Sequence, residues 1–169
     1  RLACHNGHLD IAKLLYQIKP DINISTSNDD PFRWACYDGH LDIAKWLYQI
    51  KPDINISTND DSAFRYACYD GYLDIAKWLY QIKPDINISY EDEVAFRYAC
   101  RYGHIHIVKW LLQIKPDINI SAKNEYAFRL ACHNGHLDIA KLLYQIKPDI
   151  NISTSNDDPF RWACYDGHL

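Results

Sequence analysis

Cysteine and histidine recur together along this chain, and side chains of these two types could jointly ligate zinc. Cys4 and His5, for example, reappear as Cys132 and His133. A zinc site needs about four converging ligands. Here the cysteines are expected to face a helical core, while the histidines follow a helix end or lie on the solvated face. The ligand count is not reached, so we predict no metal site.

The cysteines could instead form disulfides. They lie at steps of 32 residues, at Cys4, Cys36, Cys68, Cys100, Cys132 and Cys164. Neighbouring packed helices are about 8–10 Å apart, whereas a disulfide needs Cα atoms within about 7 Å. Each cysteine adjoins an alanine, and a free cysteine packs like a small hydrophobic residue. We therefore predict inert core thiols, which favour a reducing, cytoplasmic location.

Pairs of adjacent carboxylates could be mistaken for a catalytic acid and base. Asp29 and Asp30 form one such pair, and Asp60 and Asp61 form the next. Adjacent acidic residues at a helix entry are ordinarily caps that complement the helix dipole. No serine, cysteine or lysine stands in an activating context, and no glycine-rich phosphate loop is present. The sequence therefore predicts neither an enzyme nor a cofactor.

Composition and charge exclude several classes of partner. The chain has 169 residues, 48% of them hydrophobic, and a formal net charge of −4, which is typical of a soluble globular protein. No run approaches the roughly 18 apolar residues that a membrane span requires. No basic stripe is present to bind a phosphate backbone. We expect no membrane, no nucleic acid and no small-molecule substrate.

The step of 32 residues also governs the glycines and prolines, and it indicates a single repeat array over residues 1–169. The glycines are Gly7, Gly39, Gly71, Gly103, Gly135 and Gly167. The repeat units are 25–56, 57–88, 89–120 and 121–152, with partial units 1–24 and 153–169. A unit of this kind is stacked on copies of itself, because it cannot bury its own apolar face.

Each unit predicts two helices. In the unit 25–56, the apolar stripe from Phe32 to Gly39 predicts the first helix, and Leu41 to Ile50 predicts the second. Gly39 is expected to end the first helix with a positive φ. Pro52 bars continuation of the second. The predicted fold class is all-α, a helix–turn–helix repeat solenoid of about five stacked repeats.

These residues resemble an ankyrin repeat. Residues 39–47 read Gly-His-Leu-Asp-Ile-Ala-Lys-Trp-Leu and are followed by Asp-Ile-Asn at 53–55, close to the family's usual signature. The family's Thr-Pro-Leu-His start is replaced by Asp-Pro-Phe-Arg at 30–33, so we expect a simple loop in place of the β-hairpin finger. The amino-acid sequence of the repeats is similar to that of ankyrin arrays in giant DNA viruses of amoebae. A viral source would place the chain in the host cytoplasm or the virion.

The resemblance implies a protein–protein interaction module or scaffold whose partner binds along the concave surface. The residue pair before each glycine varies between units and would look onto that surface, beside the loop tips. Tyrosine and arginine concentrate binding energy at interfaces, although a tyrosine here could merely cover a neighbouring helix. The divergent unit 89–120 is the foremost candidate. The expected protein-binding residues are Tyr37, Asp38, Tyr69, Asp70, Glu91, Asp92, Arg101, Tyr102, His133 and Asn134.

A second function class follows from the identity of residues 1–41 with residues 129–169. An open-ended stack whose two faces match can join head to tail, and a heterologous contact that does not close makes a filament. The chain could therefore be a structural protein whose partner is itself. The identical ends could equally reflect a fragment of a longer array, a duplication or a designed tile.

Overall fold

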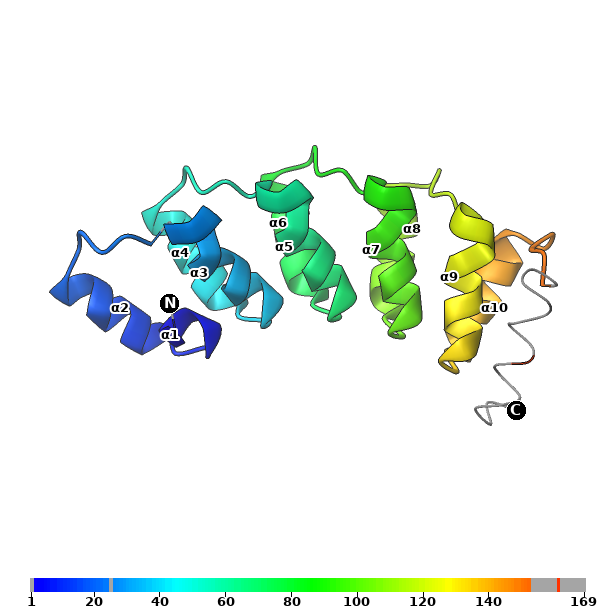
Figure 1. Cartoon of the computed structure of the whole chain (residues 1–169), viewed down its shortest axis with the longest axis horizontal. Helices are drawn as coiled ribbons and strands as arrows, with labels where there is room; N and C mark the ends of the chain where they lie inside the picture. The colour runs from blue at the N-terminus through cyan, green and yellow to red at the C-terminus, as the bar shows by residue number, and fades with distance from the viewer. Residues whose placement is uncertain (1, 25, 153–160, 162–169) are drawn as a thin grey trace. The chain divides into compact units, whose positions relative to one another are not determined.

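The computed structural model describes residues 2–24, 26–152 and 161, and it places no strand among them. The helices come in pairs joined by tight turns, as the repeat predicts (Figure 1). They are α1 (Leu2–His5), α2 (Leu9–Ile18), α3 (Thr26–Tyr37), α4 (Leu41–Ile50), α5 (Thr58–Tyr69), α6 (Leu73–Ile82), α7 (Tyr90–Arg101), α8 (Ile105–Ile114), α9 (Ala122–His133) and α10 (Leu137–Ile146). The described part of the chain is thus an all-α repeat solenoid in fold class, and a loop stands where a β-hairpin finger would be.

The chain divides into two compact units. The first comprises Arg1–Ala67 with Asp74–Ile86, and the second comprises Cys68–Leu73 with Asn87–Leu169. In the first unit α1 packs against α2 and α3, and α3 packs against α4. In the second unit α7 packs against α8 and α9, and α10 packs against α9 and α8 (Figure 1). Within each unit, neighbouring repeats therefore cover one another, as a stack requires. A single array over residues 1–169 stays a prediction.

The second helix of each pair has the bounds that the sequence predicts. α4 runs from Leu41 to Ile50, after Gly39 with φ 83° and before the extended Lys51 with φ −142°. Its stripe of Ile43, Ala44 and Leu47 is buried. None of the described helices is both long enough and apolar enough to cross a bilayer.

The helices α5, α7 and α9, each the first of its pair, begin earlier than predicted and are kinked. In α5, three consecutive residues, 59–61, have φ values between 53° and 57°, in the left-handed region. Residues 91–93 of α7 and 123–125 of α9 repeat this geometry. The acidic residues at the entry therefore form a left-handed turn before the right-handed helix, where the sequence predicted ordinary caps. Asp29 and Asp30, predicted as caps in the first full unit, have side chains outside the described set.

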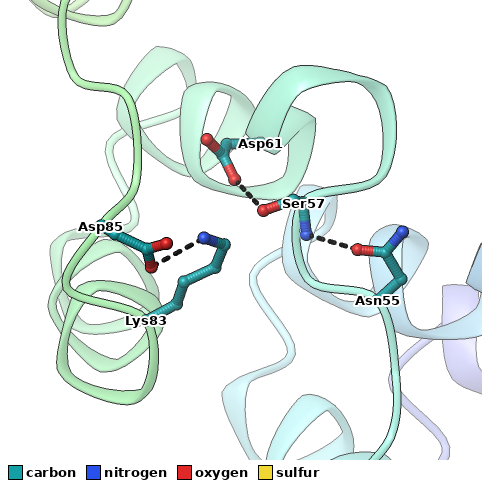
Figure 2. A network of polar contacts seen from close by, with 5 residues as sticks. All are labelled: Asn55, Ser57, Asp61, Lys83 and Asp85. Atoms are coloured by element: carbon teal, nitrogen blue, oxygen red, sulfur yellow. Dashed lines mark hydrogen bonds and ion pairs between the residues drawn. The ribbon is translucent and has the colours of Figure 1, made fainter.

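Hydrogen bonds that a serine donates to an asparagine and to an acidic side chain order the chain at this turn. The backbone N–H of Ser57 donates to Asn55 Oδ1 at 3.1 Å, and the Ser57 hydroxyl donates to Asp61 Oδ1 at 2.7 Å (Figure 2). The serine-to-acid bond recurs from Ser89 to Glu93 at 2.8 Å and from Ser121 to Glu125 at 2.9 Å. The acid at the end of the turn thus accepts a bond from the residue that precedes the helix.

In the Lys-Pro-Asp sequence that follows the second helix of a repeat, the lysine and the aspartate form an ion pair. Lys83 Nζ lies 2.7 Å from Asp85 Oδ1 (Figure 2). The pairs Lys115–Asp117 and Lys147–Asp149 repeat the contact at 3.0 and 3.1 Å. The hydrogen bond from the lysine lowers the pKa of each aspartate below its ordinary value. These pairs are solvent-exposed, so they contribute little to stability.

The cysteines form part of the core, as predicted. Cys36, Cys68 and Cys100 are fully buried, and all five described cysteines are free thiols. Burial raises the pKa of these three thiols well above the ordinary range, and it raises the pKa of Cys132 to about 11. The thiolate is the reactive form, so these side chains are chemically inert. Cys164 lies outside the described residues.

Candidate protein-binding surface

A glycine and a histidine from neighbouring repeats meet at the turns of Gly7, Gly71 and Gly103. Gly103 has φ 79°, and a Cβ added there would lie 2.6 Å from Cε1 of His136. The His136 Nε2–H donates to the carbonyl oxygen of Arg101 at 2.9 Å. Gly71 and His104 repeat this arrangement, with Tyr69 O as the acceptor at 2.8 Å. The glycine is required both for its φ and for the space that the ring occupies.

This glycine–histidine contact, which we call the histidine joint, positions candidate binding residues. The carbonyls held by the histidines belong to Tyr69 and Arg101, at the ends of α5 and α7. Bonding between repeats therefore fixes the backbone of two predicted interface residues before any partner arrives. The sequence places these histidines in the turn or on the solvated face, and it gives no sign of the bond, because the acceptor lies 35 residues away in the chain. The bonding role was missed.

In the second unit the predicted tyrosines and arginine do come together. The Tyr69 hydroxyl donates to the Tyr102 hydroxyl at 2.9 Å, and the two ring centroids are 4.4 Å apart. Tyr98 packs edge-on against Tyr69 at 5.4 Å. The Arg101 guanidinium carbon lies 5.3 Å from the centroid of the Tyr102 ring, which is cation–π geometry. We call Tyr69, Tyr98, Arg101 and Tyr102 the tyrosine–arginine patch.

The first unit carries a related aromatic group around Tyr37. Its ring lies 5.5 Å from Trp34 and 4.2 Å from Tyr66, and its hydroxyl donates to Ser62 Oγ at 2.9 Å. Tyr66 is exposed. Tyr37 is half-buried and takes part in packing within its unit, which is the alternative that the sequence left open for such a tyrosine.

Two members of these groups were missed in the sequence. Tyr66 and Tyr98 stand three residues before the predicted Tyr69 and Arg101, in the variable position of Phe-Arg-x-Ala-Cys. Residues three apart on a helix lie on the same face. That spacing was the available signal, and it would have added both tyrosines to the predicted surface.

The remaining predicted residues at the helix ends have contacts within the chain. Asp38 Oδ2 lies 2.5 Å from Nδ1 of His5. Asn134 Nδ2 donates to the carbonyl of Leu130 at 2.8 Å and so satisfies the end of its own helix. His133 is half-buried, and Asp70 is exposed. Asp38 and Asn134 therefore have structural partners already.

Glu91 and Asp92 lie at the opposite end of α7 from Arg101 and Tyr102. The right-handed part of α7, which follows residues 91–93, separates the two groups. The backbone carbonyls of Glu91 and Asp92 accept bonds from the Arg97 guanidinium at 2.7 and 2.8 Å. The Asp92 carboxylate lies 3.4 Å from Lys123 Nζ. The structure does not bring these acids into the tyrosine–arginine patch.

The Tyr69–Tyr102 bond should be visible in a titration. The hydrogen bond that Tyr69 donates to Tyr102, together with partial desolvation, raises the pKa of Tyr69 above its ordinary value. A raised pKa means that the contact is complete at neutral pH and is lost as the pH rises through the folded value. Tyr102→Phe should lower the pKa of Tyr69 toward about 10, measured by NMR on tyrosine labelled with ¹³C. Tyr16→Phe, in the other unit, should leave it unchanged, and an unshifted value in Tyr102→Phe would contradict the assignment.

The described residues offer little other chemistry. Among them, no group of three or more histidine, cysteine, aspartate or glutamate side chains is placed to hold a metal ion. What the helix ends present is large aromatic area with phenol and guanidinium groups, the side chains that dominate protein interfaces.

Comparison with known families agrees with this architecture. A family model describing ankyrin repeats in three copies matches residues 1–92 and 96–169. A comparison with curated protein sequences gives no match. The giant-virus source therefore stays a prediction that rests on the sequence of the repeats alone.

Proposed function

The chain belongs to the ankyrin-repeat family, whose repeats are general protein-interaction modules, and from this premise we propose that it binds a partner protein through the tyrosine–arginine patch. The observation that carries the proposal is the cluster of Tyr69, Tyr102 and Arg101 at adjoining helix ends. Tyr102 is exposed, so the cluster is open to solvent. Ankyrin repeats are typically non-enzymatic, and an interaction role needs no catalytic group.

The geometry supports binding at low entropic cost. A tyrosine brings a large contact area with few rotatable bonds, and immobilising a flexible side chain on binding costs about 0.5–1.5 kcal/mol. Here the Tyr69–Tyr102 bond and the ring contacts already restrain the side chains. The bond from His136 restrains the backbone of Arg101. A preformed patch of this kind suits a protein surface with apolar side chains and exposed carbonyl acceptors.

The proposal is tested with the triple variant Tyr69→Ala, Arg101→Ala, Tyr102→Ala. Hot-spot side chains of these types each contribute about 2 kcal/mol or more, so a partner isolated with the wild-type chain should bind the variant at least about 100-fold more weakly. Binding would be measured by calorimetry and folding by the thermal midpoint, which should change little because the patch is at the surface.

Matched controls separate binding from folding. Lys109→Ala and Lys141→Ala remove exposed cations from α8 and α10 of the same unit, and should leave partner affinity unchanged. If the triple variant loses its fold together with its binding, the three residues belong to the structure. If it keeps full affinity, the binding site lies elsewhere.

The setting of this function is part of the proposal. We place it in a reducing compartment, the cytoplasm of a cell or of a virus-infected host. Buried free thiols at Cys36, Cys68 and Cys100 support this placement, because unpaired cysteines are typical of proteins in reducing compartments.

A further inference from the structure

The residue pair before the glycine changes its charge in the unit 89–120. In the preceding unit the pair is Tyr69-Asp70. Here it is Arg101-Tyr102, so the formal charge of the pair changes from −1 to +1. The histidine joint forms on a tyrosine as well as on an arginine, so stacking does not require the cation.

The guanidinium of Arg101 has no acidic partner within the part of the chain that the structure describes. Its contact there is with the ring of Tyr102. Arg97, one turn earlier, differs because it donates to two backbone carbonyls and is 6% exposed. Arg101 is half-buried, and a guanidinium has five N–H donors around its edge. These donors make no hydrogen bond to the described chain, so they stay available to a ligand.

A second donor lies beside these N–H groups. The Tyr102 hydroxyl accepts the hydrogen bond from the Tyr69 hydroxyl, so its own proton remains to be donated. Tyr102 is exposed. The tyrosine–arginine patch therefore presents a phenol O–H and a guanidinium together, and both need an acceptor on the partner.

This set of donors fits a carboxylate. A guanidinium holds a carboxylate through two parallel N–H···O bonds, and a carboxylate oxygen has a further lone pair for a phenol proton. Within the patch, the one cation is that of Arg101.

A nearby negative charge favours a singly charged ligand over a phosphate dianion. The pKa of Tyr69 is raised chiefly by its hydrogen bond to the neighbouring tyrosine; the charge of Asp70 raises it further, and that of Arg101 lowers it. Both charges therefore act at the patch. A dianion would be repelled by Asp70 with a single guanidinium to offset the repulsion.

We propose that an aspartate or glutamate side chain of the partner binds at the patch, with its carboxylate accepting hydrogen bonds from the Arg101 guanidinium and the Tyr102 hydroxyl. This inference rests on the proposed function, because it concerns the same surface, and it adds the chemistry that the partner must carry. Tyr69 and Tyr98, which pack edge-on at 5.4 Å, supply aromatic area for apolar neighbours of the acid.

Benzoate and benzamide test the assignment without the partner. The two molecules have nearly the same shape, and only benzoate carries a charge. In an NMR titration at fixed ionic strength, benzoate should shift the Arg101 Nε–H and Tyr102 ring signals, with an affinity at least about 10-fold higher than that of benzamide. Equal affinities would show ring stacking alone and overturn the proposal. Phenyl phosphate that binds more tightly than benzoate would overturn the choice of a carboxylate.

Three variants and a control locate the bound anion. Arg101→Gln should weaken benzoate binding at least about 10-fold, and Arg101→Lys should restore part of it, because lysine keeps the charge without the planar fork. Tyr102→Phe should weaken binding about 3-fold to 10-fold, since it removes one donor and keeps the ring. Lys109→Gln removes an exposed cation from α8 of the same unit and should leave benzoate binding unchanged. Undiminished benzoate binding by Arg101→Gln would place the anion elsewhere and overturn the proposal.

The isolated partner separates this inference from the proposed function. Arg101→Gln should weaken partner binding, and helicity should stay unchanged. If the triple alanine variant loses the partner while Arg101→Gln keeps full affinity, the patch binds the partner and the carboxylate assignment is wrong. If benzoate binds as expected while the triple variant keeps the partner, the anion site exists and the proposed function is wrong.

Discussion

Gly103→Ala is expected to destabilise the second unit by about 3 kcal/mol. The left-handed φ of 79° costs an alanine roughly 1–2 kcal/mol. The new Cβ would lie 2.6 Å from the His136 ring, which must move and give up its bond to Arg101 O, a loss of about 1 kcal/mol. The thermal midpoint should fall by roughly 6–12 °C, measured by circular dichroism.

A double-mutant cycle with His136→Ala isolates the contact between the ring and the glycine. The single change His136→Ala should cost about 1 kcal/mol through the lost hydrogen bond. Adding Gly103→Ala to it should then cost only the backbone strain, because the ring is gone. The two costs should therefore fall short of additivity by about 1 kcal/mol, where distant sites would add. Additive costs would show that the ring does not restrict Gly103.

Arg97→Ala is expected to cost about 3 kcal/mol. Arg97 is 6% exposed, and its guanidinium donates to the carbonyls of Glu91 and Asp92, within the left-handed turn that opens α7. It also lies 5.4 Å from the centroid of the Tyr126 ring. Hydrogen bonds to a charged group contribute about 1.5–3 kcal/mol, and a partly desolvated cation–π contact contributes about 1 kcal/mol. Denaturant unfolding measures the loss, and hydrogen exchange at residues 91–93 should accelerate.

Arg65 provides a matched comparison for Arg97. It makes the same two contacts, to the carbonyls of Asn59 and Asp60 at 2.8 and 3.0 Å, but it is only half-buried. Solvent competes for the exposed bonds, so Arg65→Ala should cost about half as much. Arg97→Lys keeps the charge but not the planar fork, and it should recover only part of the stability. Equal stability of Arg97→Ala and the wild type would mean that the turn holds its shape without the arginine.

Residues with a local structural signal made much of the fold predictable. Gly39 indicates the end of α3, because glycine tolerates a positive φ. Pro52 indicates the end of α4, because proline fixes its own φ and lacks the backbone N–H. The burial of Cys36, Cys68 and Cys100 followed from a strict period and from the small residue beside each thiol. Signals of this kind need no knowledge of distant contacts.

The left-handed turn at residues 91–93 was not predictable in the same way. Its acids resemble helix caps when read along the sequence, since a cap and a left-handed turn both favour short polar residues. The group that holds the turn is Arg97, through bonds from a side chain to the backbone five and six residues away. The hydrogen bond from the histidine to the carbonyl was unpredictable for a similar reason, because its acceptor belongs to the preceding repeat.

The candidate site was also only partly predictable from the sequence. Tyr69, Arg101 and Tyr102 were found because they vary while their neighbours repeat, and the structure clusters them. Glu91 and Asp92 vary as well, yet they lie at the far end of α7. Variation between repeats identifies residues that stacking leaves free, but it cannot tell which end of a helix they share.

α4 and α6 have the same ten residues in the same order. A gene that encodes such interchangeable modules can gain or lose a whole thirty-two-residue period by recombination, and every surviving neighbour would still find a matching surface. The length of the protein can thus change without compensating substitutions in the remaining repeats. Selection can then act separately on how many modules are kept and on which side chains stand at positions such as 101 and 102.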